Sequence, residues 1–114
     1  CHLVEASKNL NDKIISAAER KNIKIYKGTT ACLDCFDVYA TDISKFFERM
    51  PENIKPISAE MEAFALFYVA KMLGRQASCL MSVVDSKYIN EVATTEEREK
   101  GLDKMIELAL DSIL

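Results

Sequence analysis

The sequence is poor in the residues that mark membrane-spanning or fibrous proteins. Of its 114 residues none is tryptophan, only two are proline and only three are glycine. The longest uninterrupted apolar run, residues 63–70, is far shorter than the roughly 20 residues that a membrane-spanning helix needs. No signal-peptide pattern precedes that run. We therefore expect no contact with a membrane.

An excess of positive charge is also missing. Fifteen lysines and arginines stand against eighteen acidic residues, which gives a formal net charge of -3, and the basic residues are scattered. Proteins that bind phosphate backbones gather basic residues on one face, so nucleic acid is not an expected partner. An apolar content of 49% with 29% charged residues is typical of a globular protein, and the length suits one compact domain.

The four cysteines do not form a convincing metal site. Cys32 and Cys35 have the CxxC spacing of zinc or redox motifs, but there is no second pair, and His2 is the only histidine. Because structural zinc usually takes four ligands, we favour a structural role for these cysteines, as reduced thiols in the cytoplasm. We expect no metal and no cofactor. Since the chain opens on Cys1, we also expect it to begin inside a longer domain.

The first half of the sequence alternates helical and extended patterns. Apolar residues recur at helical spacing in residues 9–21, and an alternating segment at residues 23–26 predicts a short strand. Residues 32–39 predict a second strand or an extended loop. A short helix is expected at residues 42–50, where Pro51 ends it.

The second half repeats this alternation. Residues 60–73 are apolar nearly all round, which predicts a helix buried on most sides, with Gly74 as its carboxyl cap. The continuous apolar run 77–84 predicts a central strand covered on both faces. Thr94 and Glu97 have capping-box spacing and predict the start of a last helix. Its apolar stripe comprises Leu102, Met105, Ile106, Ala109, Leu110 and Ile113. The expected fold class is α/β, with helices packed on a mixed sheet.

Two groups of residues are candidates for chemistry. Glu60 and Glu62 flank Met61 at the start of an apolar helix. Carboxylates at this end of a helix are favoured by its dipole, which is one explanation of the pair. The other is ligand binding, because a carboxylate accepts two hydrogen bonds and suits the paired hydroxyls of a sugar.

Asp85 follows the predicted central strand, at the end where open α/β sheets bind ligands. Arg98 lies in the first turn of the last helix, where the helix dipole slightly disfavours a positive charge. That misfit points to a role for Arg98, and a solvated helix surface is the alternative explanation.

The segments SAEMEA (58–63), VVDS (83–86), TTEER (94–98) and DKMIELAL (103–110) together resemble the hexameric, bacterial-type purine nucleoside phosphorylases. The resemblance covers residues 60–114 well and extends weakly back to Leu10. EMEA alone is shared with related nucleoside hydrolases, whereas TTEER and the helix after it favour the purine phosphorylases. The resemblance implies that residues 1–114 form the carboxyl-terminal portion of a three-layer phosphorylase/hydrolase-like fold whose amino-terminal half is absent.

The resemblance also implies roles for the acidic turn, which we define as residues 60–62, and for an aromatic wall. Glu62 is expected to hydrogen-bond the ribose hydroxyls, Met61 to pack on the sugar, and Glu60 to line the pocket. Phe36 and Tyr39 are candidates for stacking on the base. The substrates would be a purine nucleoside and phosphate.

Asp85 would be the general acid that protonates the purine at N7, and Arg98 would promote that transfer. An aspartic acid ordinarily titrates near pH 4, so this role requires a raised pKa. Ser86 stands where the family commonly has histidine. The glycine loop and arginines that hold phosphate belong to the family's amino-terminal half and have no counterpart here.

The leading hypothesis is therefore phosphorolysis of purine nucleosides to free base and ribose 1-phosphate, in cytoplasmic purine salvage and in a homo-oligomer, a hexamer in the family. A related nucleoside hydrolase is an alternative. So is a non-catalytic fragment that binds nucleosides or oligomerises, because an incomplete sheet exposes apolar surface. A zinc or thiol-redox module is the remaining rival.

Overall fold

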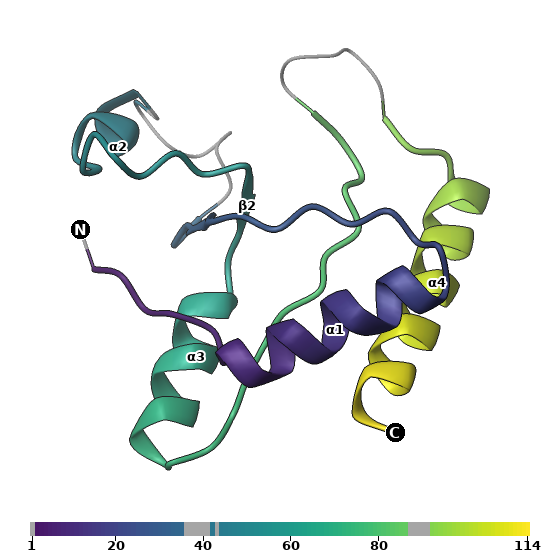
Figure 1. Ribbon diagram of the computed structural model, residues 1–114. Helices are drawn as coiled ribbons and strands as arrows, with labels where there is room; N and C mark the ends of the chain where they lie inside the picture. The colour runs from purple at the N-terminus through teal and green to yellow at the C-terminus, as the bar shows by residue number, and fades with distance from the viewer. Residues whose placement is uncertain (1, 36–41, 43, 87–91) are drawn as a thin grey trace. The chain divides into compact units, whose positions relative to one another are not determined.

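The computed structural model describes residues 2–35, 42, 44–86 and 92–114. The chain divides into two units. The first comprises Cys1–Glu5 and Tyr26–Arg75, and the second Ala6–Ile25 and Gln76–Leu114. The elements run α1, β1, α2, β2, α3 and α4 along the chain (Figure 1). None of the helices in these described ranges is long and apolar enough to cross a membrane.

The second unit is a pair of packed helices, α1 (Lys8–Arg20) and α4 (Thr95–Ile113) (Figure 1). The helix predicted at residues 9–21 is confirmed as α1. Ser7 caps it by accepting a hydrogen bond from the Leu10 amide at 3.3 Å. Asn22, at a φ of 54°, ends it in the left-handed conformation that asparagine tolerates.

The core of this unit is small. Ala17 and Ala18 of α1 and Leu108 of α4 are buried against one another, and four partly buried side chains surround them: Ile14, Ile23, Ile25 and Leu80. In the described part of the chain as a whole, every buried hydrophobic residue except Leu108 is an alanine. The two helices therefore approach closely, and they remove little apolar area from water.

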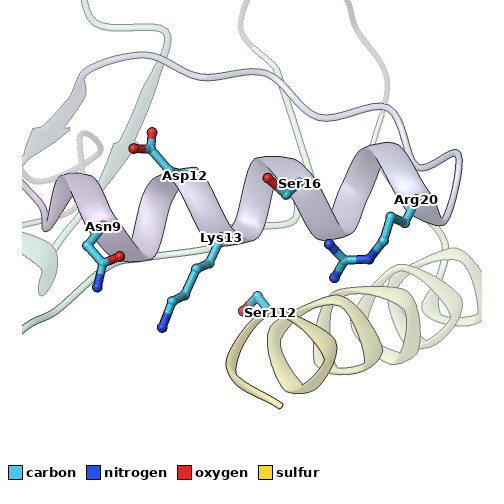
Figure 2. A pocket seen from close by; sticks show the side chains of 6 residues that line it. All are labelled: Asn9, Asp12, Lys13, Ser16, Arg20 and Ser112. Atoms are coloured by element: carbon cyan, nitrogen blue, oxygen red, sulfur yellow. The ribbon is translucent and has the colours of Figure 1, made fainter.

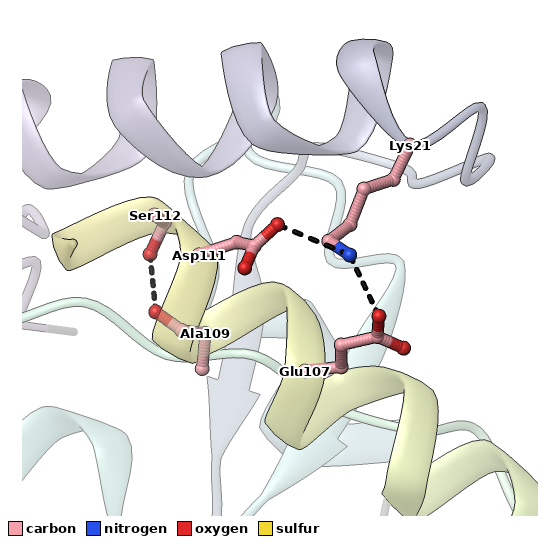
Figure 3. A network of polar contacts seen from close by, with 5 residues as sticks. All are labelled: Lys21, Glu107, Ala109, Asp111 and Ser112. Carbon is pink, nitrogen blue, oxygen red and sulfur yellow. Dashed lines mark hydrogen bonds and ion pairs between the residues drawn. The ribbon is translucent and has the colours of Figure 1, made fainter.

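One lysine joins the two helices at the edge of that core. Lys21 Nζ lies 2.7 Å from Glu107 Oε1 and 3.1 Å from Asp111 Oδ2 (Figure 3). Hydrogen bonds to Glu107 and then Asp111 raise the pKa of Lys21 above its ordinary value. Since that pKa already lies far above neutrality, Lys21 stays charged and holds two successive turns of α4 to the end of α1.

The capping box predicted at the start of α4 is confirmed. The Thr94 hydroxyl accepts from the Glu97 amide at 3.2 Å, and the Glu97 carboxylate accepts from the Thr94 amide at 2.8 Å. These hydrogen bonds lower the pKa of Glu97 below its ordinary value. Both bonds satisfy amide groups that no helical carbonyl can reach.

The buried side of α4 differs from the predicted stripe. Leu108 and Ser112 are buried, and the Ser112 hydroxyl donates to the Ala109 carbonyl at 2.7 Å (Figure 3). Leu102, Ile106 and Leu110 of the stripe are instead exposed. The apolar surface of α4 is thus wider than the contact with α1, which covers only one side of it.

The first unit is built on a two-stranded parallel sheet. β1 (Thr30–Cys32) pairs with β2 (Ser58–Glu60) in the register Thr30 with Ser58 and Cys32 with Glu60. The Leu33 amide continues the ladder by donating to the Glu60 carbonyl at 2.8 Å. A parallel pair needs a crossover connection, and this one contains α2 (Ser44–Glu48), the shorter form of the helix predicted at 42–50.

The helix predicted at residues 60–73 is α3 (Ala63–Met72), which follows β2 directly. Gly74 has a φ of 62° and ends it as predicted. The expectation that this helix is buried on most sides is wrong: only Ala63 is buried, and Tyr68, Val69 and Met72 are exposed. An apolar helix is buried only where another element covers it, and two three-residue strands offer little cover.

Two predicted strands are not observed. Residues 23–26 and residues 77–84 run without a ladder partner, apart from single contacts such as Ser7 N to Ala77 O at 2.8 Å. A strand exists only when a neighbour satisfies its backbone groups, and apolar β-branched sequence alone does not provide that neighbour. The described residues form helices and a small parallel sheet, which agrees with the predicted α/β class.

Candidate functional site

Glu60 ends β2 and caps α3. Its Oε2 accepts hydrogen bonds from the Glu62 amide at 2.7 Å and from the Ala63 amide at 2.5 Å. It therefore takes the place of a side-chain cap from Glu62, the N-cap residue, which makes none. Of the two explanations given for the acidic pair, stabilisation of a helix start is the one that accounts for the hydrogen bonds of Glu60.

Cys32 lies against the other side of this carboxylate. The Oε1 of Glu60 is buried and has no hydrogen-bond partner of ordinary geometry. The Cys32 thiol, paired across the ladder, is close enough for burial and then the negative charge of Glu60 to raise its pKa above the ordinary value, against the opposing amide of Phe64. Cys32 is thus a protonated thiol next to the Glu60 carboxylate.

Glu62 and Met61 remain available on the other side of this turn. Both are exposed, Met61 by 36%, and Glu62 Oε2 accepts only a 3.2 Å hydrogen bond from the Met61 amide. The rigid cap at Glu60 fixes the backbone from which Glu62 projects. The Glu62 carboxylate can accept further hydrogen bonds from two hydroxyl groups.

Asp85 lies in the second unit, where it forms an isolated antiparallel bridge with Val92. Beside that bridge the Ala93 amide donates to the Val84 carbonyl at 2.8 Å. The Asp85 side chain is exposed.

The Arg98 side chain contacts the residue that follows this bridge. Its Nε donates to the Ala93 carbonyl at 3.2 Å. Ala93 thus has two separate hydrogen bonds, one from its amide to the carbonyl of Val84, the neighbour of Asp85, and one from the Arg98 side chain to its own carbonyl. Asp85 bridges to Val92 and Arg98 bonds to Ala93, so the structure brings the two predicted catalytic residues to the same short segment of backbone.

The predicted site residues do not all lie in one unit of the structure. Phe36 and Tyr39 lie outside the described residues. Glu60, Met61 and Glu62 belong to the first unit, and Asp85 and Arg98 to the second. No group of three or more histidine, cysteine or acidic residues within the described ranges is placed to hold a metal ion.

A shallow pocket of about 220 Å³ lies between α1 and α4, and none of these residues lines it (Figure 2). Its walls are polar side chains of the two helices: Asn9, Asp12, Lys13, Ser16, Arg20 and Ser112. Sites for small organic ligands are usually larger and mostly apolar. This pocket does not have the character of a nucleoside site.

Sequence reasoning missed the contact between Cys32 and Glu60. The two residues are 28 positions apart, and only the parallel register of β1 and β2 places them opposite each other. No local pattern encodes that register. The cysteine had a structural role among its possible explanations, and its position behind the Glu60 carboxylate is in keeping with that role.

A family model described as the phosphorylase superfamily matches residues 2–113. The chain belongs to the phosphorylase superfamily. This match reaches well beyond residues 60–114, which the four sequence segments covered best.

Relatives of this superfamily member carry the name purine nucleoside phosphorylase DeoD-type. Those of Actinobacillus succinogenes and Xenorhabdus nematophila are 33% and 36% identical to it over 100 residues, which is 88% of this chain and 40% of each relative. That of Psychromonas ingrahamii is 33% identical over 109 residues, 96% of this chain and 44% of the relative. The chain thus spans about two fifths of the length of these relatives.

Proposed function

We propose that this chain is the carboxyl-terminal portion of a purine nucleoside phosphorylase and supplies its sugar-binding and base-protonating residues. The observation that carries the proposal is the turn from β2 into α3. Glu60 is fixed there by two backbone amides, and the Glu62 carboxylate is left exposed beside Met61. Family membership and the DeoD-type relatives support the proposal.

In the proposed reaction phosphate attacks C1′ of the nucleoside, the glycosidic C–N bond breaks, and its electron pair moves into the purine. Glu62 accepts hydrogen bonds from the ribose hydroxyls, Met61 packs on the sugar, and Glu60 holds the turn and lines the pocket. Phe36 and Tyr39 are the proposed stacking wall for the base. The products are free base and ribose 1-phosphate.

Asp85 is the proposed acid that transfers a proton to N7, which neutralises the charge that develops on the leaving base. The hydrogen bonds that Ala93 makes with Val84 and with Arg98 support the pairing of Asp85 and Arg98. Asp85 is exposed here, so the remainder of the enzyme would have to shield it from water before it could act as the acid. Phosphate is the co-substrate and no cofactor is involved.

The wider setting follows from the same proposal. The complete protein would have the three-layer phosphorylase/hydrolase-like fold, with helices on a mixed sheet. It would assemble as a homo-oligomer, a hexamer as the family resemblance implies, and act in cytoplasmic purine salvage.

The test is the release of base from inosine by this chain joined to the amino-terminal part of the Actinobacillus succinogenes relative. We expect phosphate-dependent release, and we expect Glu62→Gln to lower kcat/KM by about tenfold or more, since it weakens a charge-assisted hydrogen bond. Lys55→Gln, an exposed change in the same unit, is the matched control.

Two results would contradict the proposal. Release of base without phosphate would indicate a nucleoside hydrolase. Full activity in Glu62→Gln would remove the carboxylate from sugar binding.

A further inference from the structure

One face of α4 is apolar and open to solvent. Leu102, Ile106, Leu110 and Ile113 recur at intervals of four, four and three residues, so they line one side of the helix. Their exposed fractions are 47, 50, 51 and 63%. We call these four residues the α4 face. It is distinct from the buried side that contains Leu108 and Ser112.

The face is not the ordinary scatter of surface hydrophobics. Single exposed leucines and isoleucines are common in soluble proteins, but contiguous ones along three turns of a helix mark a contact surface. Three charged residues lie on another side of α4 and are exposed: Lys100, Lys104 and Glu107. The helix therefore has two apolar sides for two neighbours, and α1 is only one of them.

The length of the relatives indicates the second neighbour. Nearly all of this chain matches a phosphorylase model, while it spans only 40 to 44% of the DeoD-type relatives. The larger part of the length of those relatives has no counterpart in these 114 residues. The buried hydrophobics in the described ranges, four alanines and one leucine, also fall short of the core that a domain of this size normally forms.

We propose that the α4 face is an interface, and that its occupant is the complementary part of a phosphorylase chain, the polypeptide that corresponds to the unmatched region of a DeoD-type relative. Burial of four large aliphatic side chains would stabilise that contact. The proposal rests on family membership and on the exposed face, and it does not depend on which reaction the assembled protein catalyses.

The experiment is co-expression of this 114-residue protein with the unmatched region of the Actinobacillus succinogenes relative, which carries the affinity tag. The same is done with the Xenorhabdus nematophila relative. We expect the untagged chain to co-purify. Hydroxyl-radical footprinting should label Leu102, Ile106 and Leu110 in the chain alone and should label them several-fold less in the complex.

Aspartate substitutions at two different positions of α4 locate the contact. Ile106→Asp places a charge in the face, and Lys104→Asp places one at an exposed position on the opposite side of the helix. Because both positions are exposed, the helix content measured by circular dichroism should be unchanged in each. We expect Ile106→Asp to reduce retention about tenfold or more and Lys104→Asp to leave it near the wild-type level.

Several outcomes would overturn the proposal. They are failure of the wild-type chain to associate with either region, equal retention of the two variants, and protection of the face in the isolated chain. A dimer of this chain that Ile106→Asp dissociates would make a second copy the occupant. Association that depends on Ile106 without any phosphorolysis would uphold the interface and count only against the proposed function.

Discussion

At the scale of single residues, the carboxylate of Glu60 shapes its surroundings most. It caps α3 with Oε2, and its negative charge acts on the Cys32 thiol. Burial and this negative charge raise the pKa of the Cys32 thiol. The reactive form of cysteine is the thiolate, so reactivity reports on this contact directly.

We expect iodoacetamide at pH 8 to modify Cys35 and Cys79, which are exposed, several-fold faster than Cys32. Peptide mass spectrometry over time gives the three rates. Glu60→Gln should accelerate the reaction of Cys32, because it removes the charge that opposes ionisation. Denaturation in guanidinium should make the rates similar, and a Cys32 rate equal to that of Cys35 in the folded protein would contradict the contact.

The candidate residues could be chosen from sequence because their chemistry is local. Glu60, Met61 and Glu62 are consecutive, and their position at a helix start follows from the apolar run after them. The sequence could not show that Glu60 caps the helix while Glu62 stays exposed, because this depends on which carboxylate reaches the Glu62 and Ala63 amides. The contact of Cys32 required the register of a parallel sheet.

At the scale of elements, the ends of the helices are set by a few hydrogen bonds. The capping box of α4 joins Thr94 and Glu97. Thr94→Ala should lower the stability of the protein by about 1 kcal/mol, since it leaves the Glu97 amide without its partner. Thermal unfolding followed by circular dichroism measures the loss, and Thr95→Ala, one residue further along, is the control.

The same box predicts a pH dependence. The pKa of Glu97 is lowered from its ordinary 4.5 by hydrogen bonds from Thr94. A depressed pKa in the folded state means that the stabilisation is present above about pH 4.5 and is lost as the pH falls through the lower folded value. The difference in melting temperature between wild type and Glu97→Gln should therefore shrink on acidification from pH 7 to pH 3. A constant difference would contradict this linkage.

Gly74 ends α3 at a φ of 62°, with no atom near the position that a Cβ would occupy. Gly74→Ala should cost about 1 kcal/mol through backbone strain alone. Gly74→Asn should cost less, because asparagine tolerates this conformation. Equal unfolding midpoints for the three proteins in urea would show that the end of α3 is frayed in solution.

Helices were predictable from this sequence and strands were not, for a physical reason. A helix satisfies its backbone within one segment, so the spacing in α1, the box at Thr94 and the glycine at position 74 were sufficient. A strand needs a neighbour that the local sequence does not contain. Residues 77–84 have strand composition, yet they form no ladder in the described part of the chain.

At the scale of the whole molecule, the proposed function requires Asp85 to donate a proton to the purine base. In the joined protein with the Actinobacillus succinogenes segment, Asp85→Asn should lower kcat for inosine by a factor of about 100 or more. A nucleoside methylated at N7 already carries the positive charge that protonation would create. Its kcat should therefore fall much less, and parallel losses on both substrates would argue against a proton transfer by Asp85.

The parallel pairing of β1 and β2 also bears on how this protein can vary. Ladder hydrogen bonds, including Leu33 N to Glu60 O and Ile57 N to Thr29 O, fix the register at both ends of the pair. The length of the crossover between the strands is therefore uncoupled from the position of the acidic turn. Insertions and deletions in that crossover can accumulate during evolution while Glu60 and Glu62 keep their place.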